Sequence, residues 1–167
     1  SDGTLLAVDS SGAVTESQPW GTRPWSGTLG RGVREVFAAP GGRLIAIRHA
    51  RGDSLLVSSR EAGVSLAEPV PEAVDRSASR DGDAVAFATD SGVAVLEDRE
   101  PGRPWFVRIA GQPRTVVFSP SGHRLYVALR GKSELAVIDR FTRSERAAIA
   151  LPGPAAALRF DPWGRVL

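Results

Sequence analysis

Residues 115–139 read TVVFSPSGHRLYVALRGKSELAVID, and this stretch sets the pattern for the whole chain. It contains three short apolar runs, at Val116–Phe118, Leu125–Val127 and Leu135–Ile138. The first two runs are separated by Ser119–Gly122, which is made of residues that favour tight turns. Short apolar runs bounded by turn residues are typical of β-strands. The stretch therefore predicts three consecutive strands.

The turn that ends at Gly122 recurs along the chain at nearly constant intervals. Similar phrases place glycine at positions 3, 42, 82, 122 and 164, so the spacings are 39, 40, 40 and 42 residues. The third residue after each of these glycines is apolar: Leu6, Ile45, Val85, Leu125 and Leu167. A period of about 40 residues is the length of one four-stranded blade of a β-propeller. The spacing thus predicts a repeated four-stranded unit.

The rest of the period supplies the other strands. An apolar run precedes each turn, a second follows it, and a third comes after another short turn. A fourth run is weaker, as expected for an outermost strand that is half exposed to solvent. We therefore expect an all-β chain of about four four-stranded antiparallel blades, with approximate repeats at 1–33, 34–73, 74–113 and 114–155 and a partial repeat at 156–167. The partial repeat would begin with a first strand at Leu158–Phe160.

Composition excludes several classes of protein. The chain has 167 residues, of which 42% are hydrophobic and 24% charged, and its 18 glycines and 12 prolines interrupt it too often for long helices. It has no cysteine, which excludes disulfides and thiolate zinc sites. No apolar run is long enough to span a membrane as a helix. A net charge of +2 gives no clear nucleic-acid signature.

The stretch from Thr115 to Asp139 resembles a YVTN-type β-propeller repeat. The resemblance rests on its Ser-Pro-x-Gly turn, the Leu-Tyr-Val-Ala of its second strand and the Val-Ile-Asp that ends the third. Other copies keep only the hydrophobic outline, so the WD-like and TolB-like repeat families stay open as alternatives. The resemblance implies a recognition platform, or more rarely an enzyme, built on one frame. It also favours an extracytoplasmic location.

The two ends of the chain both fall inside a repeat. Ser1 lies in a turn before a second strand and Leu167 lies within another second strand, which suggests a piece of a longer chain. About four blades would form part of a larger ring, or half of an eight-bladed ring completed by a second copy. Flat apolar flanks of the first and last blades would favour such association. Trp163 replaces a small turn residue and is the candidate interface residue.

Catalytic and metal-binding patterns are missing from the sequence. His49 and His123 are the only histidines, and the repeat places them in turns on opposite faces of a propeller. Neither has a cysteine or a closely spaced carboxylate at a metal-ligand distance in sequence. We expect no metal, no cofactor and no catalytic residue within this chain, and the balance of these patterns is against an enzyme.

The candidate binding residues come from the distribution of charge. The loops between second and third strands and between fourth and first strands share one face of a propeller, and this face is predicted to be basic. Its candidate residues are Arg48, His49, Arg51, Arg114, Arg130 and Lys132. A basic face favours an acidic protein segment or an anionic polymer as partner. The alternative is a lactonase or quinoprotein-like enzyme whose site lies in a central channel completed by other blades.

Overall fold

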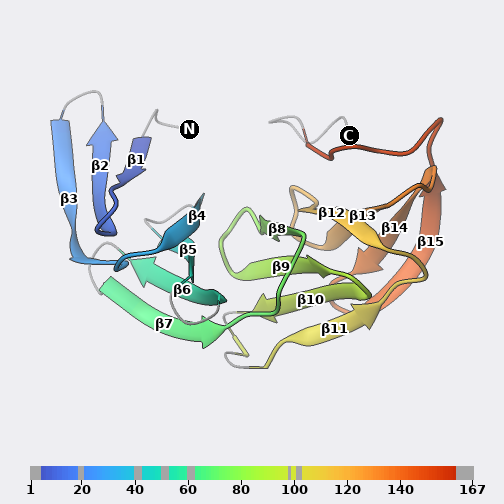
Figure 1. Ribbon diagram of the computed structural model, residues 1–167, viewed down its shortest axis with the longest axis horizontal. Helices are drawn as coiled ribbons and strands as arrows, with labels where there is room; N and C mark the ends of the chain where they lie inside the picture. Colours follow the sequence, from blue (N-terminus) through green and yellow to red (C-terminus); the bar gives the residue numbers. More distant parts are fainter. Residues whose placement is uncertain are drawn as a thin grey trace. The chain divides into compact units, whose positions relative to one another are not determined.

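The computed structural model describes residues 5–18, 21–39, 43–49, 53–59, 63–97, 99–100 and 103–160. These residues form strands and turns, with no α-helix among them. Accordingly, the described part of the chain offers no helix with the length and hydropathy needed to cross a membrane. The chain divides into two compact units, Ser1–Val70 and Pro71–Leu167. Each unit is built from two antiparallel sheets (Figure 1).

The first unit holds a three-stranded and a four-stranded sheet. The smaller sheet consists of β1 (Leu5–Val8), β2 (Ala13–Gln18) and β3 (Gly21–Thr28), in that order. The larger sheet consists of β4 (Val33–Ala39), β5 (Arg43–His49), β6 (Asp53–Ser59) and β7 (Gly63–Pro69). Val14 and Leu29 are the buried centre of a cluster that also includes Val8, Val33 and Val36.

The second unit holds two four-stranded sheets. The third sheet of the chain consists of β8 (Asp75–Ala78), β9 (Ala84–Thr89), β10 (Gly92–Glu97) and β11 (Trp105–Arg108). The fourth consists of β12 (Pro113–Phe118), β13 (Arg124–Leu129), β14 (Glu134–Asp139) and β15 (Ser144–Ala150). Strands lie side by side in chain order within each sheet, which is the predicted arrangement of first to fourth strands.

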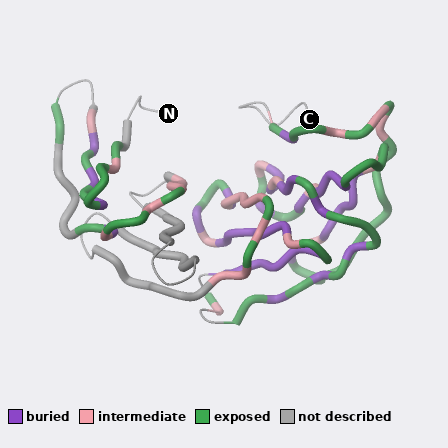
Figure 2. Tube along the Cα trace, viewed as in Figure 1, coloured by how far each residue is buried: buried purple, intermediate pink, exposed green. Residues whose placement is uncertain are grey.

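One hydrophobic core joins the third and fourth sheets. It pairs small side chains of β9 with large side chains of β12 and β13, so that the two sheets can approach closely. The β9 contribution is Ala84, Ala86 and Ala88, and the facing side chains include Val116, Phe118, Leu125, Val127 and Leu129. Figure 2 shows the continuous burial along β9 and β10, which are buried on both faces.

The turns that revealed the repeat adopt one geometry in both sheets of the second unit. The amide of Gly122 donates to the Ser119 carbonyl at 2.8 Å, and the amide of Gly82 donates to the Ser79 carbonyl at 3.0 Å. Both glycines have positive φ angles, 71° and 68°, a conformation that side chains with a Cβ disfavour. The recurring glycine is therefore a backbone requirement of this turn.

The prediction of a first strand at Leu158–Phe160 is wrong for the structure, which places these residues outside any strand. A strand needs a ladder partner, and no described strand pairs with this segment. Its side chains are nevertheless packed. Leu158 is buried against Ala128 and Leu135, and the ring of Phe160 meets Tyr126 edge-on with centroids 5.5 Å apart. The segment packs against the fourth sheet as a neighbouring strand would, but it forms no backbone ladder with a described strand.

Candidate functional site

Charged side chains gather at two rims of the second unit. The turn rim comprises the connections from first to second and from third to fourth strands. The loop rim comprises the connections 90–91, 109–112 and 130–133, which join second to third and fourth to first strands, together with the adjoining strand residues Arg114 and Glu134. Because neighbouring strands are antiparallel, these two sets of connections lie at opposite ends of the sheets.

Arg140 occupies the centre of the turn rim and binds carboxylates of the third sheet. Its Nε donates to Glu97 Oε1 at 2.6 Å, and its Nη2 donates to Asp83 Oδ2 at 2.8 Å. The exposed fraction of the side chain is 6% for Arg140 and 0% for Glu97. The guanidinium also lies 5.9 Å from the centroid of the Phe118 ring. Arg140 is thus a buried link between the two sheets.

Further arginines surround the same carboxylates. Arg99 binds Glu97 at 3.0 Å, while Arg143 reaches Glu100 at 2.7 Å and Glu97 at 3.7 Å. We call these residues, together with Asp83 and Arg140, the ion-pair cluster. Arg143 has a positive φ of 52°, and its guanidinium lies 5.8 Å from the Trp105 ring centroid.

The ion-pair cluster shifts the pKa of its acidic members. Burial is the largest single influence on Glu97 and Asp83 and opposes their ionisation. The hydrogen bond and charge of Arg140, together with hydrogen bonds from Arg99 to Glu97 and from Ser79 to Asp83, outweigh it, and the pKa of each carboxyl lies below its ordinary value. The same balance raises the pKa of Arg140. Both signs mean that the charged forms are favoured in the folded state. A cluster of permanently charged, mutually satisfied groups is suited to holding sheets together rather than to moving protons.

Hydrogen bonds also join the first strands of the two sheets. Asp75 on β8 accepts from the Val116 amide at 2.9 Å and from the Thr115 hydroxyl. Ser77 accepts from the Phe118 amide at 3.3 Å. β12 is the edge strand of the fourth sheet, so the amides on its outer side have no neighbouring strand among those described. The side chains of Asp75 and Ser77 accept the hydrogen bonds of two of these amides. Asp75, on the first strand of the third sheet, is therefore assigned to sheet packing.

Unlike Arg140, the basic side chains of the loop rim, Arg114, Arg130 and Lys132, are exposed. Lys132 Nζ donates to the Ala110 carbonyl at 2.6 Å and contacts Glu134 Oε1 at 3.2 Å. The Arg130 amide donates to the Gln112 carbonyl at 2.8 Å, two residues from Arg114. These bonds bring the connections 109–112 and 130–133 together. Three of the predicted binding residues, Arg114, Arg130 and Lys132, therefore lie close to one another.

The side chains of Arg114 and Arg130 are exposed. Neither forms an ion pair with any residue in the described part of the chain. Arg114 sits where the β12–β13 register shifts between Pro113 and Thr115, an irregularity of the kind that redirects a side chain. The loop rim also carries Asp90, which is exposed, and Glu134, which is engaged with Lys132.

The remaining predicted residues are less defined. Arg48 and His49 end strand β5, for which the structure describes the backbone alone, and Arg51 and Trp163 lie outside the described residues. His123 is exposed on the turn rim, where its ring meets Phe141 edge-on at 5.1 Å. Within the described ranges, no three His, Cys, Asp or Glu side chains are grouped so that they could hold a metal ion.

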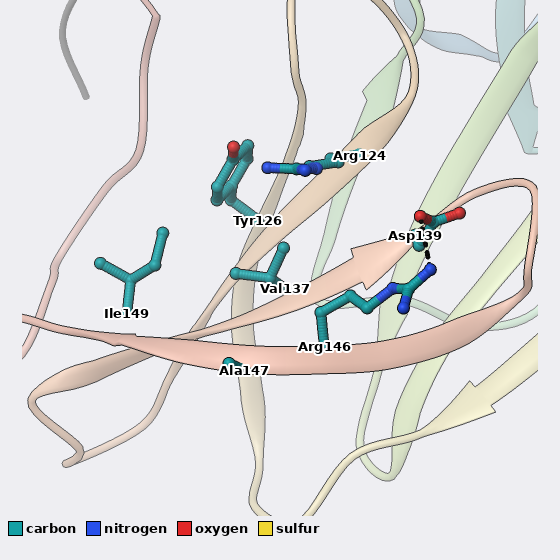
Figure 3. A pocket seen from close by; sticks show the side chains of 7 residues that line it. All are labelled: Arg124, Tyr126, Val137, Asp139, Arg146, Ala147 and Ile149. Atoms are coloured by element: carbon teal, nitrogen blue, oxygen red, sulfur yellow. Dashed lines mark hydrogen bonds and ion pairs between the residues drawn. The ribbon is translucent and has the colours of Figure 1, made fainter.

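Sequence reasoning missed a groove on the fourth sheet. The groove has a volume of about 420 Å³ and lies across β13, β14 and β15 on the face that points away from the third sheet (Figure 3). Its apolar floor is formed by Tyr126, Val137, Ala147 and Ile149, and its charged end by Arg124, Asp139 and Arg146. Arg146 binds Asp139 at 3.1 Å. The repeat places Arg124 and Tyr126 at the positions that Ala84 and Ala86 have in β9. It does not predict a groove there, because the groove depends on large side chains in place of alanines.

No family model and no curated protein matches the sequence, but solved structures share its fold. Apo AztD from Citrobacter koseri superposes with a TM-score of 0.67 at 16% identity, covering 92% of this chain and 46% of that one. The nidogen/laminin complex gives 0.57 at 14% identity, with coverages of 88% and 59%. Kuenenia stuttgartiensis hydrazine synthase gives 0.63 at 21% identity, with coverages of 98% and 51%.

These comparisons establish the fold class. AztD and the nidogen domain are β-propellers, and this chain is an all-β protein with the same antiparallel sheets. Identities of this size show the fold alone. The chain spans about half the length of these three structures, between 46% and 59%.

Proposed function

We propose that this β-propeller is a non-enzymatic recognition scaffold whose loop rim binds an acidic segment of a protein partner. The observation that carries the proposal is the state of Arg114 and Arg130, which are exposed and form no ion pair with a described residue. Guanidinium groups bind carboxylates through two parallel hydrogen bonds, so a pair on one rim suits a run of Asp and Glu.

The hydrogen bonds of the loop rim support the proposal. Lys132 is held by Ala110 and Arg130 by Gln112, so the backbone of both connections is ordered before any partner binds. Less ordering entropy is then lost on binding. Arg48, His49 and Arg51 are proposed as binding residues of the second repeat. The repeats at 1–33, 34–73, 74–113, 114–155 and 156–167 remain the proposed units.

Support from relatives is limited to the fold. One of the matching structures is a complex of nidogen with laminin, so a propeller of this class occurs in a protein–protein complex. A YVTN-type repeat and an extracytoplasmic location remain part of the proposal. The ring would be completed by further sheets or by a second copy of the chain.

The test is the binding of a fluorescein-labelled oligoglutamate peptide, measured by fluorescence anisotropy across a series of NaCl concentrations. Wild-type protein is expected to bind with an affinity that falls as salt rises. The triple variant Arg114→Ser, Arg130→Ser, Lys132→Ser is expected to lose at least tenfold in affinity and most of the salt dependence.

A matched variant controls for net charge. Arg80→Ser, Arg103→Ser, Arg124→Ser removes the same number of positive charges from exposed residues away from the loop rim. It is expected to bind within about twofold of wild type. Equal losses in the two triple variants would show that net charge alone attracts the peptide, and would reject the loop rim as the site.

The second candidate is a propeller enzyme with a site in a central channel. Its support is the fold similarity to hydrazine synthase, an enzyme by name. The described inner-strand residues favour the scaffold, because Asp75 and Ser77 are committed to hydrogen bonds with the next sheet. A lactonase or quinoprotein-like activity in the isolated chain would favour the enzyme.

A further inference from the structure

The groove on the fourth sheet is charged at one end, where the matching positions of the third sheet are apolar. The repeat places Arg124 at the position of Ala84, and the strand pairing places Arg146 where β11 has Trp105. Ala84 and Trp105 belong to the apolar core between the two sheets, whereas the side chain of Arg146 is 53% exposed and Arg124 is also exposed. Covering two guanidinium groups with another apolar sheet would cost free energy. The groove is therefore better suited to a ligand that brings its own charge.

The charged end of the groove has one positive charge in excess. Asp139 Oδ1 accepts the amides of Phe141 and Thr142, each at 3.0 Å, and Oδ2 accepts from Arg146 Nη2 at 3.1 Å. Both oxygens of this carboxylate are engaged, and its charge offsets that of Arg146. Arg124 forms no ion pair within the part of the chain that the structure describes. Its guanidinium is the cation left for a ligand.

The rest of the groove is an apolar floor. The residues that form it are Tyr126, Val137, Ala147 and Ile149. The ring of Tyr126 is held by its edge-on contact with Phe160, and Ile149 is 38% exposed. In Figure 3 the side chain of Arg124 points toward Tyr126, so the excess cation lies beside the floor. The volume of about 420 Å³ lies within the range of small-molecule sites.

We propose that the groove binds a small monocarboxylate with an apolar body. The carboxylate pairs with the guanidinium of Arg124 through two parallel hydrogen bonds. The apolar body covers Tyr126 and Ile149 and removes their exposed apolar surface from water. The complementarity is thus one of charge at one end of the groove and of apolar surface along the rest.

The charges of the groove also define what it rejects. A dianion would meet a single excess cation and the carboxylate of Asp139, which repels a second negative charge. A cationic ligand would find neither oxygen of Asp139 free. The site differs from the loop rim in needing an apolar body, so the proposal stands independently of what the loop rim binds.

The test follows the amide chemical shifts of ¹⁵N-labelled protein during titration with sodium octanoate, a monocarboxylate with an unbranched apolar body. Saturable shifts are expected at residues 124–126, 137–139 and 146–149. Acetate lacks the apolar body and octylammonium reverses the charge, so each is expected to bind about fivefold more weakly than octanoate, or less tightly still. Oligoglutamate, which has no apolar body, is expected not to compete with octanoate.

Two variants separate the charge from the apolar floor. Arg124→Gln is expected to raise the Kd for octanoate about fivefold and to abolish the preference for octanoate over octylammonium. Ile149→Ser is expected to raise the Kd about threefold and to keep that preference. The matched controls are Arg108→Gln and Phe106→Ser, which alter exposed residues of β11 outside the groove and should leave the Kd within about twofold.

Other outcomes would overturn the proposal. Equal binding of octanoate and octylammonium would show apolar adhesion in which Arg124 plays no part. Shifts concentrated at residues 109–114 and 130–134 would move the carboxylate site to the loop rim. Light scattering on the same samples tests for a second copy of the chain. A dimer that excludes octanoate and that Ile149→Ser dissociates would make the groove an interface instead of a ligand site.

Discussion

Arg140 on the turn rim and the pair Arg114 and Arg130 on the loop rim show the same residue type used in opposite ways. At the turn rim, Arg140 is 6% exposed and bonded to two carboxylates of the neighbouring sheet. At the loop rim, Arg114 and Arg130 are exposed. The difference shows that abundance of arginine does not locate a binding surface. What distinguishes Arg140 from Arg114 and Arg130 is whether the fold already supplies a carboxylate for the guanidinium.

The largest expected effect comes from removing the central arginine of the turn rim. Arg140→Met leaves Glu97 buried with its best partner lost, and the free energy of unfolding should fall by about 3 kcal/mol. Urea unfolding followed by circular dichroism measures it. The double variant Arg140→Met, Glu97→Gln should recover part of the loss, because the unpaired charge is gone. A loss below about 1 kcal/mol in the single variant would contradict a structural role for the cluster.

A smaller loss is expected at the hydrogen bonds between first strands. Asp75→Ala leaves the Val116 amide and the Thr115 hydroxyl without their acceptor, and should lower the free energy of unfolding by about 1 to 3 kcal/mol. Glu72→Ala, an exposed residue nearby, is the control and should change it by less than about 0.5 kcal/mol. Equal effects of the two variants would remove Asp75 from the account of sheet packing.

Acid should weaken the turn rim selectively. The pKa of Asp139 is lowered to about 2, first by the Thr142 amide and then by Arg146 despite some desolvation, and the pKa values of Glu97 and Asp83 are also lowered. A carboxyl whose pKa is lower in the folded state stabilises the fold above its unfolded pKa and loses that effect as pH falls through the folded pKa.

The free energy of unfolding should therefore decline between about pH 4 and pH 2. Arg140→Met should show a shallower decline over this range, because Glu97 and Asp83 then lack the partner that lowers their pKa. Urea unfolding at a series of pH values measures both curves. Parallel curves for wild type and variant would indicate that the acid sensitivity arises elsewhere.

The smallest effect on stability belongs to the loop rim. Arg114→Ser, Arg130→Ser should change the free energy of unfolding by less than about 0.5 kcal/mol, because neither side chain has an ion-pair partner within the described ranges. The same urea titration measures it. A loss of 2 kcal/mol would reveal that these arginines hold the sheets together and would remove the contrast between the rims.

Sequence periodicity predicted much of the fold because each unit repeats a backbone requirement. Glycine at the 82 and 122 turns adopts positive φ, and the apolar positions three residues later, Val85 and Leu125, are buried. Leu158–Phe160 has the apolar pattern of a first strand, yet it forms no strand. Pattern specifies which side chains are buried, whereas a ladder also requires a neighbouring strand.

The site was harder to predict for a similar reason. Arg140 and Arg130 look alike in sequence. Their roles differ because Arg140 binds Glu97, a residue 43 positions earlier in the chain. The groove also depends on identities at repeated positions. Arg124 and Tyr126 stand where β9 has Ala84 and Ala86, and large side chains leave an uneven face where alanines leave a flat one.

The proposed binding surface is the loop rim and not the turn rim. Titration of ¹⁵N-labelled protein with the oligoglutamate peptide, followed by amide chemical shifts, tests it most directly. Shifts are expected to be concentrated at residues 109–114 and 130–134, with little change at residues 80–83 and 140–146. Shifts concentrated on those turn-rim residues, with the loop rim unchanged, would contradict it.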